Sequence, residues 1–398
     1  MDMRDDKIQT RRKFLKTTAA VGTVSYGSSS VLAGNNSELV EYIHFIKTND
    51  VGPGEPERIP IYRTMQRNEW NRRKAATKAA QKIYDKIRNK WGSNPIRPFF
   101  AKLNNSPTRF GVKVHYNTYV DNRGTKRSPK PKLKKVKDEL PDEITVEYDD
   151  KEFTSAVSVA ESKSEEVGDC GESVDNMLGG SWDDIPGGIP CSVEAGDSNN
   201  LGTFCATFYE TDYSAPGLIL SGHVAEELKN DIDQTGRHVA DVFDLTNNRR
   251  GVDWAYARLR EGYSPEYYIA DESNNKGNLD YTVDGIVTND GLMADTDTST
   301  IYHTQGRESR RQSGTLEEMG VNDRLRTGGQ YNDVRSSHDV GKGDSGGPLF
   351  RTNQDNTGAY IAGVMYSKFT YRPFDNDCGN ALSTTAETVE DDAPGFFH

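Results

Sequence analysis

The stretch Gly343-Asp344-Ser345-Gly346-Gly347-Pro348-Leu349 is the most specific string in the chain. The glycines behind Ser345 permit a tight turn, because glycine adopts backbone angles that other residues avoid. Such a turn exposes the serine hydroxyl and directs amide N–H groups at a developing oxyanion, as acyl transfer requires. A serine hydroxyl alone is a weak nucleophile, so this chemistry needs a histidine and a carboxylate elsewhere.

Both partners stand upstream of the serine. His223 follows an apolar run, Leu218-Ile219-Leu220, and a small-residue turn, Ser221-Gly222. Asp253 begins the segment Asp253-Trp254-Ala255-Tyr256-Ala257. Either residue alone would be read as an ordinary structural side chain, and the inference rests on their joint occurrence. The other histidines have no comparable context, which favours surface or core roles for His44, His115, His238, His303, His338 and His398.

The order His223, Asp253, Ser345 with these contexts resembles the chymotrypsin-like (trypsin-like) serine peptidases of the compact bacterial type. The resemblance covers about residues 187–383 and includes a further stretch, Gly306-Arg307 with Ser313-Gly314-Thr315, similar to the strand pair ahead of the nucleophile in bacterial members. It implies an all-β fold of two antiparallel six-stranded barrels with the active site between them.

The resemblance also implies the roles of the site residues. Ser345 would be the nucleophile, His223 the general base, and Asp253 the group that fixes the histidine tautomer. The amides of Gly343 and Ser345 would form the oxyanion hole. No metal or organic cofactor is expected.

Two features concern specificity. Val224 stands where many animal members have a cysteine, and no cysteine precedes Gly343, so the usual bridges around the site are missing. Asp339 lies six residues before Ser345, the spacing at which trypsin-type enzymes carry the carboxylate of their specificity pocket. Such a carboxylate would favour Arg or Lys before the cut. The alternative is a solvent-facing aspartate.

The 398 residues are enough for two domains and exclude a disulfide-stapled miniprotein. No run of about 18 apolar residues occurs, so no transmembrane helix is expected. Residues 61–137 carry 22 Lys/Arg and three Asp/Glu, or +19, whereas residues 171–398 carry 17 and 38, or −21. The two parts therefore attract each other or the basic part meets nucleic acid. Because no nucleic-acid motif accompanies the charge, we expect no nucleic-acid partner.

The first residues indicate export. Thr10-Arg11-Arg12-Lys13-Phe14-Leu15-Lys16 resembles a twin-arginine signal, followed by a mildly apolar stretch and a cleavage-like Val31-Leu32-Ala33. We therefore expect a signal peptide over 1–33, a basic pro-region over 34–165 and a peptidase domain over 166–398. The acidic half would also suit a salt-loving organism, which makes a halophilic source a hypothesis.

Periodicity predicts the elements. Residues 34–60 are expected to be irregular and polar, and 161–180 to be a linker. Apolar residues at three- and four-residue intervals predict a helix over 65–91. A small α/β unit follows, with strands over 109–119 and 144–148 and a helix over 132–139. Later alternating segments predict strands over 205–209, 218–221, 238–243, 252–259, 281–287, 314–318 and 359–366.

The four cysteines are Cys170, Cys191, Cys205 and Cys378, and three full pairings are open. Export would place them where disulfides persist. If residues 189–194 and 202–209 form a hairpin, Cys191 and Cys205 would face each other, and this pairing is preferred. The alternative is that all four are free thiols, and no spacing supports a metal site.

The sequence thus predicts a secreted or cell-surface serine endopeptidase whose partners are a protein or peptide substrate and its own pro-region. The alternative is a catalytically silent homologue that binds peptides or a surface. Because exposed ion pairs are weak and screened by salt, docking of the basic segment should rest mainly on apolar contacts. The candidate contacts are the strand 110–116 and the helix face through Ile83 and Ile87.

Overall fold

The structure is a computed structural model, and it describes residues 38–49, 56–91, 96–104, 106–117, 133–162, 182–192, 201–211, 215–228, 231–234, 236–248, 252–270, 279–324, 330–341, 343–369, 379–393 and 395–398. All structural statements below refer to these residues. The predicted signal peptide, most of the linker, Cys170 and Cys378 lie outside them. No helix in the described part of the chain is both long enough and apolar enough to cross a membrane.

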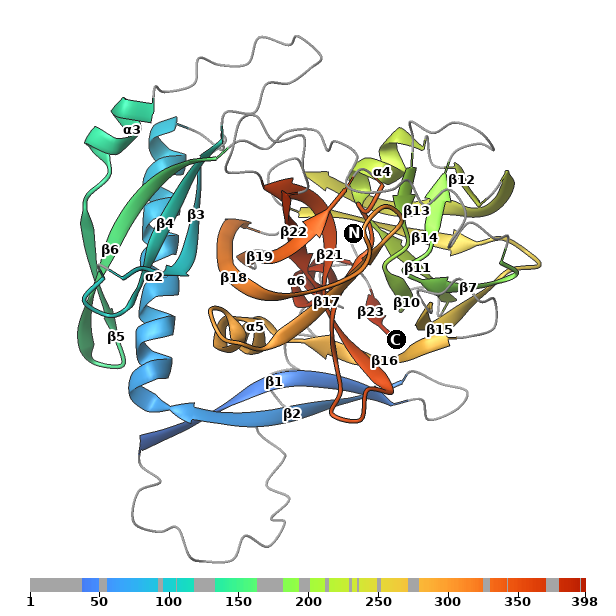
Figure 1. Ribbon diagram of the computed structural model, residues 1–398, viewed down its shortest axis with the longest axis horizontal. Coiled ribbons are helices and arrows are strands. Elements are labelled where there is room, and N and C mark those ends of the chain that lie inside the picture. The colour runs from blue at the N-terminus through green and yellow to red at the C-terminus, as the bar shows by residue number, and fades with distance from the viewer. Residues whose placement is uncertain are drawn as a thin grey trace, which may run out of the picture.

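Residues 38–162 form what we call the amino-terminal unit (Figure 1). A long hairpin leads into one long helix, which packs on a small sheet. Its elements are β1 (Leu39–Asn49), β2 (Glu57–Gln66), α2 (Arg67–Trp91), β3 (Ile96–Lys102), β4 (Phe110–Asn117), α3 (Leu133–Glu139), β5 (Glu143–Tyr148) and β6 (Lys151–Ser162).

Residues 182–398, the carboxyl-terminal unit, are mostly strands. The first part holds β7 (Asp184–Gly187), β8 (Pro190–Ser192), β9 (Leu201–Thr203), β10 (Ala206–Glu210), β11 (Ala215–Leu220), α4 (Gly222–Glu227), β12 (Asp231–Gln234), β13 (Arg237–Asn248), β14 (Val252–Leu259) and β15 (Ser264–Ala270). The second part holds β16 (Leu279–Val287), α5 (Asn289–Asp295), β17 (Ile301–Gly306), β18 (Arg310–Arg324), β19 (Gln330–Val340), β20 (Pro348–Thr352), β21 (Gly358–Phe369), β22 (Gly379–Thr385), α6 (Ala386–Asp392) and β23 (Gly395–Phe397).

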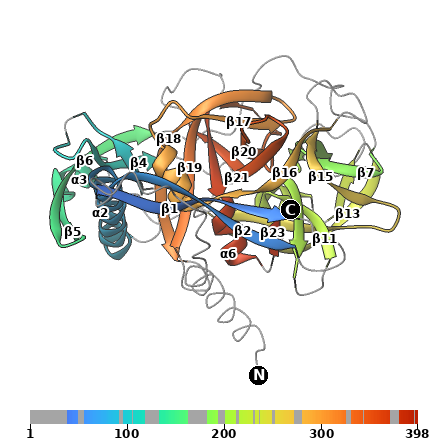
Figure 2. The same cartoon turned by 90° about the horizontal axis from the view of Figure 1, so that it is seen from below.

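Two curved sheets organise these strands, which confirms the predicted all-β fold of two barrel-like halves (Figures 1 and 2). The eight-stranded sheet has the order β23-β10-β11-β14-β13-β12-β8-β9. The fifteen-stranded sheet follows the path β2-β1-β16-β21-β20-β17-β18-β3-β4-β6-β5, with β7, β15, β19 and β22 beside it. It exceeds six strands partly because the amino-terminal unit adds its own strands to it.

Burial explains why the sheets meet where they do. One apolar cluster lies within the eight-stranded sheet and includes Phe204, Leu218 and Leu220. Another joins side chains of both sheets, such as Trp254 from β14 and Phe350 from β20. Burying a side chain of this size contributes roughly 1.5 to 3 kcal/mol, so the shared cluster holds the sheets together.

The amino-terminal unit joins the rest of the chain through two strand pairings. β1 pairs with β16 around Phe45 and Val287, and β3 pairs with β18 around Phe100 and Met319. One buried cluster then contains residues of both units, among them Phe45, Phe100 and Leu349. The unit is thus an extension of the larger sheet.

Two sequence predictions about this unit were wrong. Residues 34–60 were expected to be irregular, yet β1 and β2 form a hairpin in which Tyr42 and Phe45 are buried. Ile83 and Ile87 were expected at the junction, but they pack inside the unit against β3 and β4. The helix contacts the carboxyl-terminal unit through its first turns instead, where Trp70 and Ala76 enter the shared cluster.

Candidate active site

The loop after β19 presents Ser345. Gly343 and Gly346 have φ angles of +100° and +95°, which are accessible to glycine and costly for other residues. Two backbone hydrogen bonds close the loop: the N–H of Gly346 donates to Met365 O (2.7 Å), and the N–H of Met365 donates to Gly347 O (3.0 Å). Of the two glycines behind Ser345, Gly346 therefore has the backbone angle that the sequence argument expected, and β21 holds the loop from one side.

Asp344 anchors the same loop from inside. Its carboxylate accepts N–H bonds from Gly341 (2.6 Å), Glu308 (2.7 Å) and Ser309 (3.0 Å). Burial raises the pKa of Asp344, and the amide donors act in the opposite direction. Asp344 thus ties the loop to the turn between β17 and β18, a role that the motif alone does not indicate.

The amides proposed for the oxyanion hole are not used by the loop itself. Asp344, Gly346 and Gly347 donate their N–H groups to backbone carbonyls. Within the described residues, no hydrogen bond from the N–H of Gly343 or Ser345 is found. Two unused donors that flank one residue are the arrangement that an anionic oxygen needs.

His223 and Asp253 meet in the eight-stranded sheet. His223 is the second residue of α4, and Asp253 is the second residue of β14. Asp253 accepts the backbone N–H of His223 (2.8 Å) through Oδ1 and contacts its ring Nδ1 through Oδ2. The Asp253 side chain is 7% exposed and that of His223 is 31% exposed. An Nδ1–H bonded to Asp253 leaves Nε2 as the nitrogen that can accept a proton.

Gly222 makes this approach possible, because a Cβ there would lie 2.9 Å from Asp253 Oδ1 and 2.8 Å from Trp254 O. The glycine before His223 is therefore required for close packing. It was read from the sequence only as part of a small-residue turn.

The serine loop docks against the sheet that carries the histidine. Thr203 of β9 donates its N–H to Ser345 O (2.8 Å). Gly346 packs so closely on the same sheet that a Cβ there would lie 3.2 Å from the amide nitrogen of Ser221, two residues before His223. The Ser345 loop therefore contacts the segment that leads into α4, the helix that carries His223.

Asp339 lies in β19 and its side chain is exposed, whereas the next residue, Val340, is buried. A carboxylate at the base of a specificity pocket would be buried, so the geometry does not support that role. Beside the serine loop, a small buried cluster of Val340, Met365 and Ala381 offers apolar side chains instead.

The preferred Cys191–Cys205 disulfide was wrong. Both side chains are buried free thiols. The register of β8 and β9 places Gly202, not Cys205, opposite Cys191. Cys191 then packs in the core of the eight-stranded sheet, while Cys205 enters the cluster between the two sheets.

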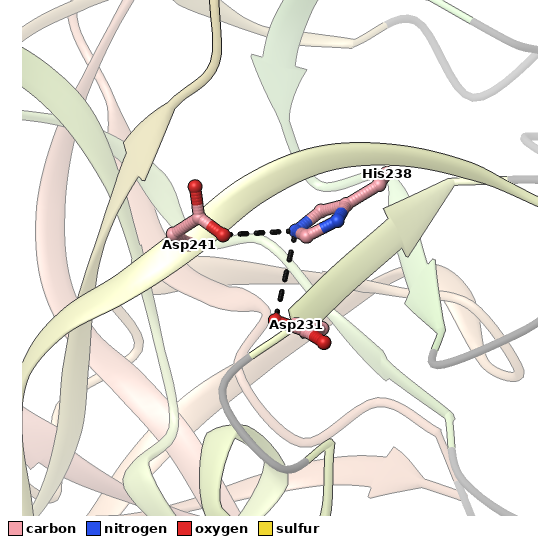
Figure 3. Close-up of side chains that lie close together, drawn as sticks. All are labelled: Asp231, His238 and Asp241. Carbon is pink, nitrogen blue, oxygen red and sulfur yellow. Dashed lines mark ion pairs between the residues drawn. The ribbon is translucent and has the colours of Figure 1, made fainter.

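A group of metal-ligand type lies on the β12–β13 hairpin (Figure 3). Asp231, His238 and Asp241 each offer an atom, all within 4.8 Å of one another. Arg260 already occupies this cluster, with Nη1 at 2.8 Å from His238 Nδ1 and Nε at 3.3 Å from Asp241 Oδ2. A guanidinium donates only, so Nδ1 accepts and the proton resides on Nε2, the atom that faces both carboxylates. These residues do not fit a metal, and we derive no chemistry from them.

Comparison with known proteins gave structural similarities only. No protein-family model matches the chain, and no curated protein matches its sequence. The chain is similar to Nocardiopsis protease (15% identity, TM-score 0.37), with 54% of this chain and 99% of that chain covered. It is similar to a glutamic acid specific serine protease described as using a histidine triad in substrate binding (18%, 0.39), over 54% and 100%. It is also similar to Cellulomonas bogoriensis chymotrypsin (15% identity, TM-score 0.37), with 54% of this chain and 98% of that chain covered.

Proposed function

We propose that the chain is an exported serine endopeptidase that cleaves peptide bonds of external proteins. The observation that carries the proposal is the junction of the two sheets. Asp253 of the sheet against which the Ser345 loop is docked holds the His223 imidazole through Nδ1. A base oriented by a carboxylate and placed beside a nucleophilic serine is the arrangement that acyl transfer requires.

In the proposed reaction, Ser345 Oγ attacks the carbonyl carbon of the peptide bond while His223 Nε2 takes the hydroxyl proton. Asp253 stabilises the imidazolium that forms. The amides of Gly343 and Ser345 stabilise the oxyanion, a contribution worth about 10²- to 10³-fold in rate for one such donor. His223 then returns the proton to the leaving amine, and water releases the acyl group by the same steps in reverse.

Casein digestion tests the proposal. The purified chain should degrade casein over some range of salt concentration, and Ser345→Ala prepared alongside should not. Equal turnover by both proteins would point to a contaminant and contradict the assignment. Peptide binding without any hydrolysis would favour the alternative, a catalytically silent homologue.

We further propose that the amino-terminal unit is the enzyme's pro-region and acts as its intramolecular partner. Contacts of opposite charge support this. Arg58 makes a two-pronged bond with Glu390 (2.8 and 2.7 Å), and Lys113 bonds Glu318 (2.7 Å). The buried Arg73 donates to the carbonyls of Met293 and Thr296, at the end of α5. The basic character of this unit and the acidic character of the rest thus meet at specific sites.

The apolar part of the junction would give most of its stability. An exposed ion pair contributes only about 0 to 1 kcal/mol and is screened by salt. The shared cluster around Phe45, Phe100 and Phe110 is buried and is much less sensitive to salt. Expression of residues 166–398 with and without residues 34–165 in trans tests the partnership. Equal folding yield and equal activity in both cases, at low and high salt, would refute it.

We also propose export by the twin-arginine route, which rests on Arg11-Arg12 and the residues behind them. Replacement of both arginines by lysine should leave the protein inside the cell, while replacement of Lys13 and Lys16 by arginine should not. Continued secretion of the doubly substituted chain would contradict this route.

A further inference from the structure

Thr203 is the last residue of β9, in the eight-stranded sheet, and its side chain is fully buried. It contacts the serine loop of the other sheet through three groups. Its N–H donates to Ser345 O (2.8 Å) and its hydroxyl donates to Gly343 O (2.7 Å). Its carbonyl lies against Gly346, close enough to exclude a Cβ there.

The hydroxyl of Thr203 is also held from behind. The N–H of Arg307 donates to it (3.2 Å), so its oxygen accepts one bond and directs its own proton to Gly343 O. The Arg307 side chain lies over Gly343 as well, since a Cβ there would be 3.5 Å from Arg307 Cδ. The orientation of the hydroxyl is therefore set by the backbone of the β17–β18 turn.

These contacts involve the two residues whose amides are proposed to form the oxyanion hole. A bonded carbonyl cannot rotate, so the peptide planes that follow Gly343 and Ser345 are held by one residue of the opposite sheet. Gly343 needs such support, because a glycine at φ +100° has many other accessible conformations. A rotation of its flanking peptides would turn the oxyanion donor away.

We propose that the Thr203 side chain is a positioning residue that holds the oxyanion loop in its catalytic conformation. This inference rests on the proposed function. It links the two halves of the site, because Asp253, which holds His223, belongs to the sheet of Thr203, and the loop with the oxyanion donors lies between two strands of the other sheet. The hydroxyl acts on the transition state through Gly343 and does not touch the substrate.

Thr207 provides a matched control. It lies on the neighbouring strand β10, is fully buried like Thr203, and also donates its hydroxyl to a backbone carbonyl, that of Glu266 (2.6 Å). Its partner belongs to β15, away from the serine loop. Removal of either hydroxyl leaves one carbonyl without that donor, and removal of the Thr203 hydroxyl also takes the acceptor from the Arg307 N–H. Both variants should therefore lose stability, Thr203→Val somewhat more.

The test compares Thr203→Val, Thr203→Ser and Thr207→Val by kcat and KM per titrated active site. It also uses a peptide boronate, which forms a tetrahedral adduct, and the unreactive peptide amide of the same sequence. Because a displacement of about 1 Å costs about 100-fold in rate, Thr203→Val should lower kcat about 10- to 100-fold. Its affinity for the boronate should fall by a similar factor, with KM and amide affinity changed less than about threefold. Thr203→Ser should restore both values to within about fivefold of the original chain.

Thr207→Val should keep both kcat and boronate affinity. If the Thr203 hydroxyl had only a structural role, Thr203→Val would keep them as well. Thr203→Ala replaces the valine variant if the latter does not fold, with the same expected loss. An unchanged kcat per active site in Thr203→Val or Thr203→Ala would overturn the inference. An equal loss of kcat in Thr207→Val would also overturn it. A parent chain that hydrolyses nothing would instead contradict the proposed function.

Discussion

The pairs His223–Asp253 and His115–Glu318 contain the same chemical groups in different surroundings. The His223 side chain is 31% exposed, whereas that of His115 is 1% exposed. His115 Nε2 lies 2.5 Å from Glu318, which also binds Lys113 and Arg335, both at 2.7 Å. Under the proposed function, the difference separates a pair whose ring is open to solvent from a pair that is enclosed and surrounded by cations.

A third pair resembles the second. His44 of β1 lies 3.2 Å from Asp295, whose carboxylate also accepts from Tyr302 (2.7 Å) and Arg351 (2.5 Å). His44 and His115 both belong to the amino-terminal unit, and both carboxylates belong to the carboxyl-terminal unit. We call His115–Glu318 and His44–Asp295 the junction pairs. They hold the two units together, whereas the His223–Asp253 pair is expected to perform chemistry.

The largest effect is expected at the nucleophile and its base. Ser345→Ala and His223→Ala should each lower kcat/KM by about 10⁴-fold or more, because both remove transition-state chemistry and little packing. Circular dichroism and Tm should stay close to those of the parent chain. Hydrolysis that survives in either variant would remove the distinction drawn between the pairs.

The next largest effect should distinguish the two carboxylates, Asp253 and Glu318. Asp253→Asn should lower kcat by about 10⁴-fold, because the amide favours the wrong histidine tautomer. Glu318→Gln should leave kcat per active site within about threefold and instead lower Tm, since Lys113 and Arg335 lose a buried counter-charge. The reverse ranking in kcat would contradict the assignment of roles.

Acid should open the junction. Burial lowers the pKa of His44 and of His115 below 6.5, so both lose protons on docking. The contribution of these two histidines to the stability of the junction is then complete above pH 6.5 and decreases as the pH falls below 6.5. Burial raises the pKa of Glu318, but His115, Arg335 and Lys113 outweigh burial and hold this pKa below 4.5. Protonation of Glu318 at still lower pH therefore also weakens the junction.

A chain carrying Ser345→Ala and an inserted cleavage site within 163–181 makes the acid effect measurable. After cleavage the two pieces should co-elute in gel filtration at pH 7.5 and separate progressively below about pH 6. Replacement of both histidines by glutamine should reduce the pH dependence, with His303→Gln as the control outside the junction. Separation that increases with pH would refute the proposed linkage.

Added salt should matter less than acid. Across the junction, the pair Lys102–Asp297 is partly exposed (34% and 26%), whereas the pair His115–Glu318 is buried (1% and 3%). Salt screens the first kind and hardly reaches the second. We expect the cleaved pieces to stay together at pH 7.5 in 2 M NaCl, and full separation there would show that exposed charge dominates the junction.

The smallest effect is expected at Asp339, the exposed carboxylate. Asp339→Asn should change kcat/KM by less than about threefold and leave the cleavage pattern unaltered, because surface charges are screened. Sequencing of cleavage products should show apolar residues before the cut, in line with Val340 and Met365 beside the serine loop. Strong Arg or Lys enrichment that disappears in Asp339→Asn would restore the trypsin-type pocket.

The parts of the fold that were predictable are those with a local signal. The strand Val252–Leu259 and the helix ending at Trp91 have clear periodicity, and the structure places both within two residues of the prediction. The strands β1 and β3 were missed, because they are stabilised mainly by pairing with β16 and β18, which are distant in sequence. Proline and basic residues in β3 also weaken its local pattern.

The candidate site divides in the same way. Ser345, His223 and Asp253 could be proposed from the sequence because three local contexts occur together in one order, although neither His223 nor Asp253 is distinctive alone. The cysteine pairing failed because it assumed a register, and β8 and β9 pair Cys191 with Gly202. Thr203 lies in no motif and contacts Gly343, 140 positions away, so no local pattern marks it. Asp344 lies within the serine motif, but its bonds to Glu308 and Ser309, 36 and 35 positions away, could not be read from that motif.

The central claim is that His223 activates Ser345, and covalent labelling tests it most directly. The intact chain should be incubated with a fluorophosphonate and digested for peptide mass spectrometry, with His223→Ala and Ser345→Ala treated in parallel. The account predicts one adduct, on Ser345, formed at least about 100-fold more slowly in His223→Ala because the base is lost. Labelling of another serine, or an equal rate in His223→Ala, would contradict it.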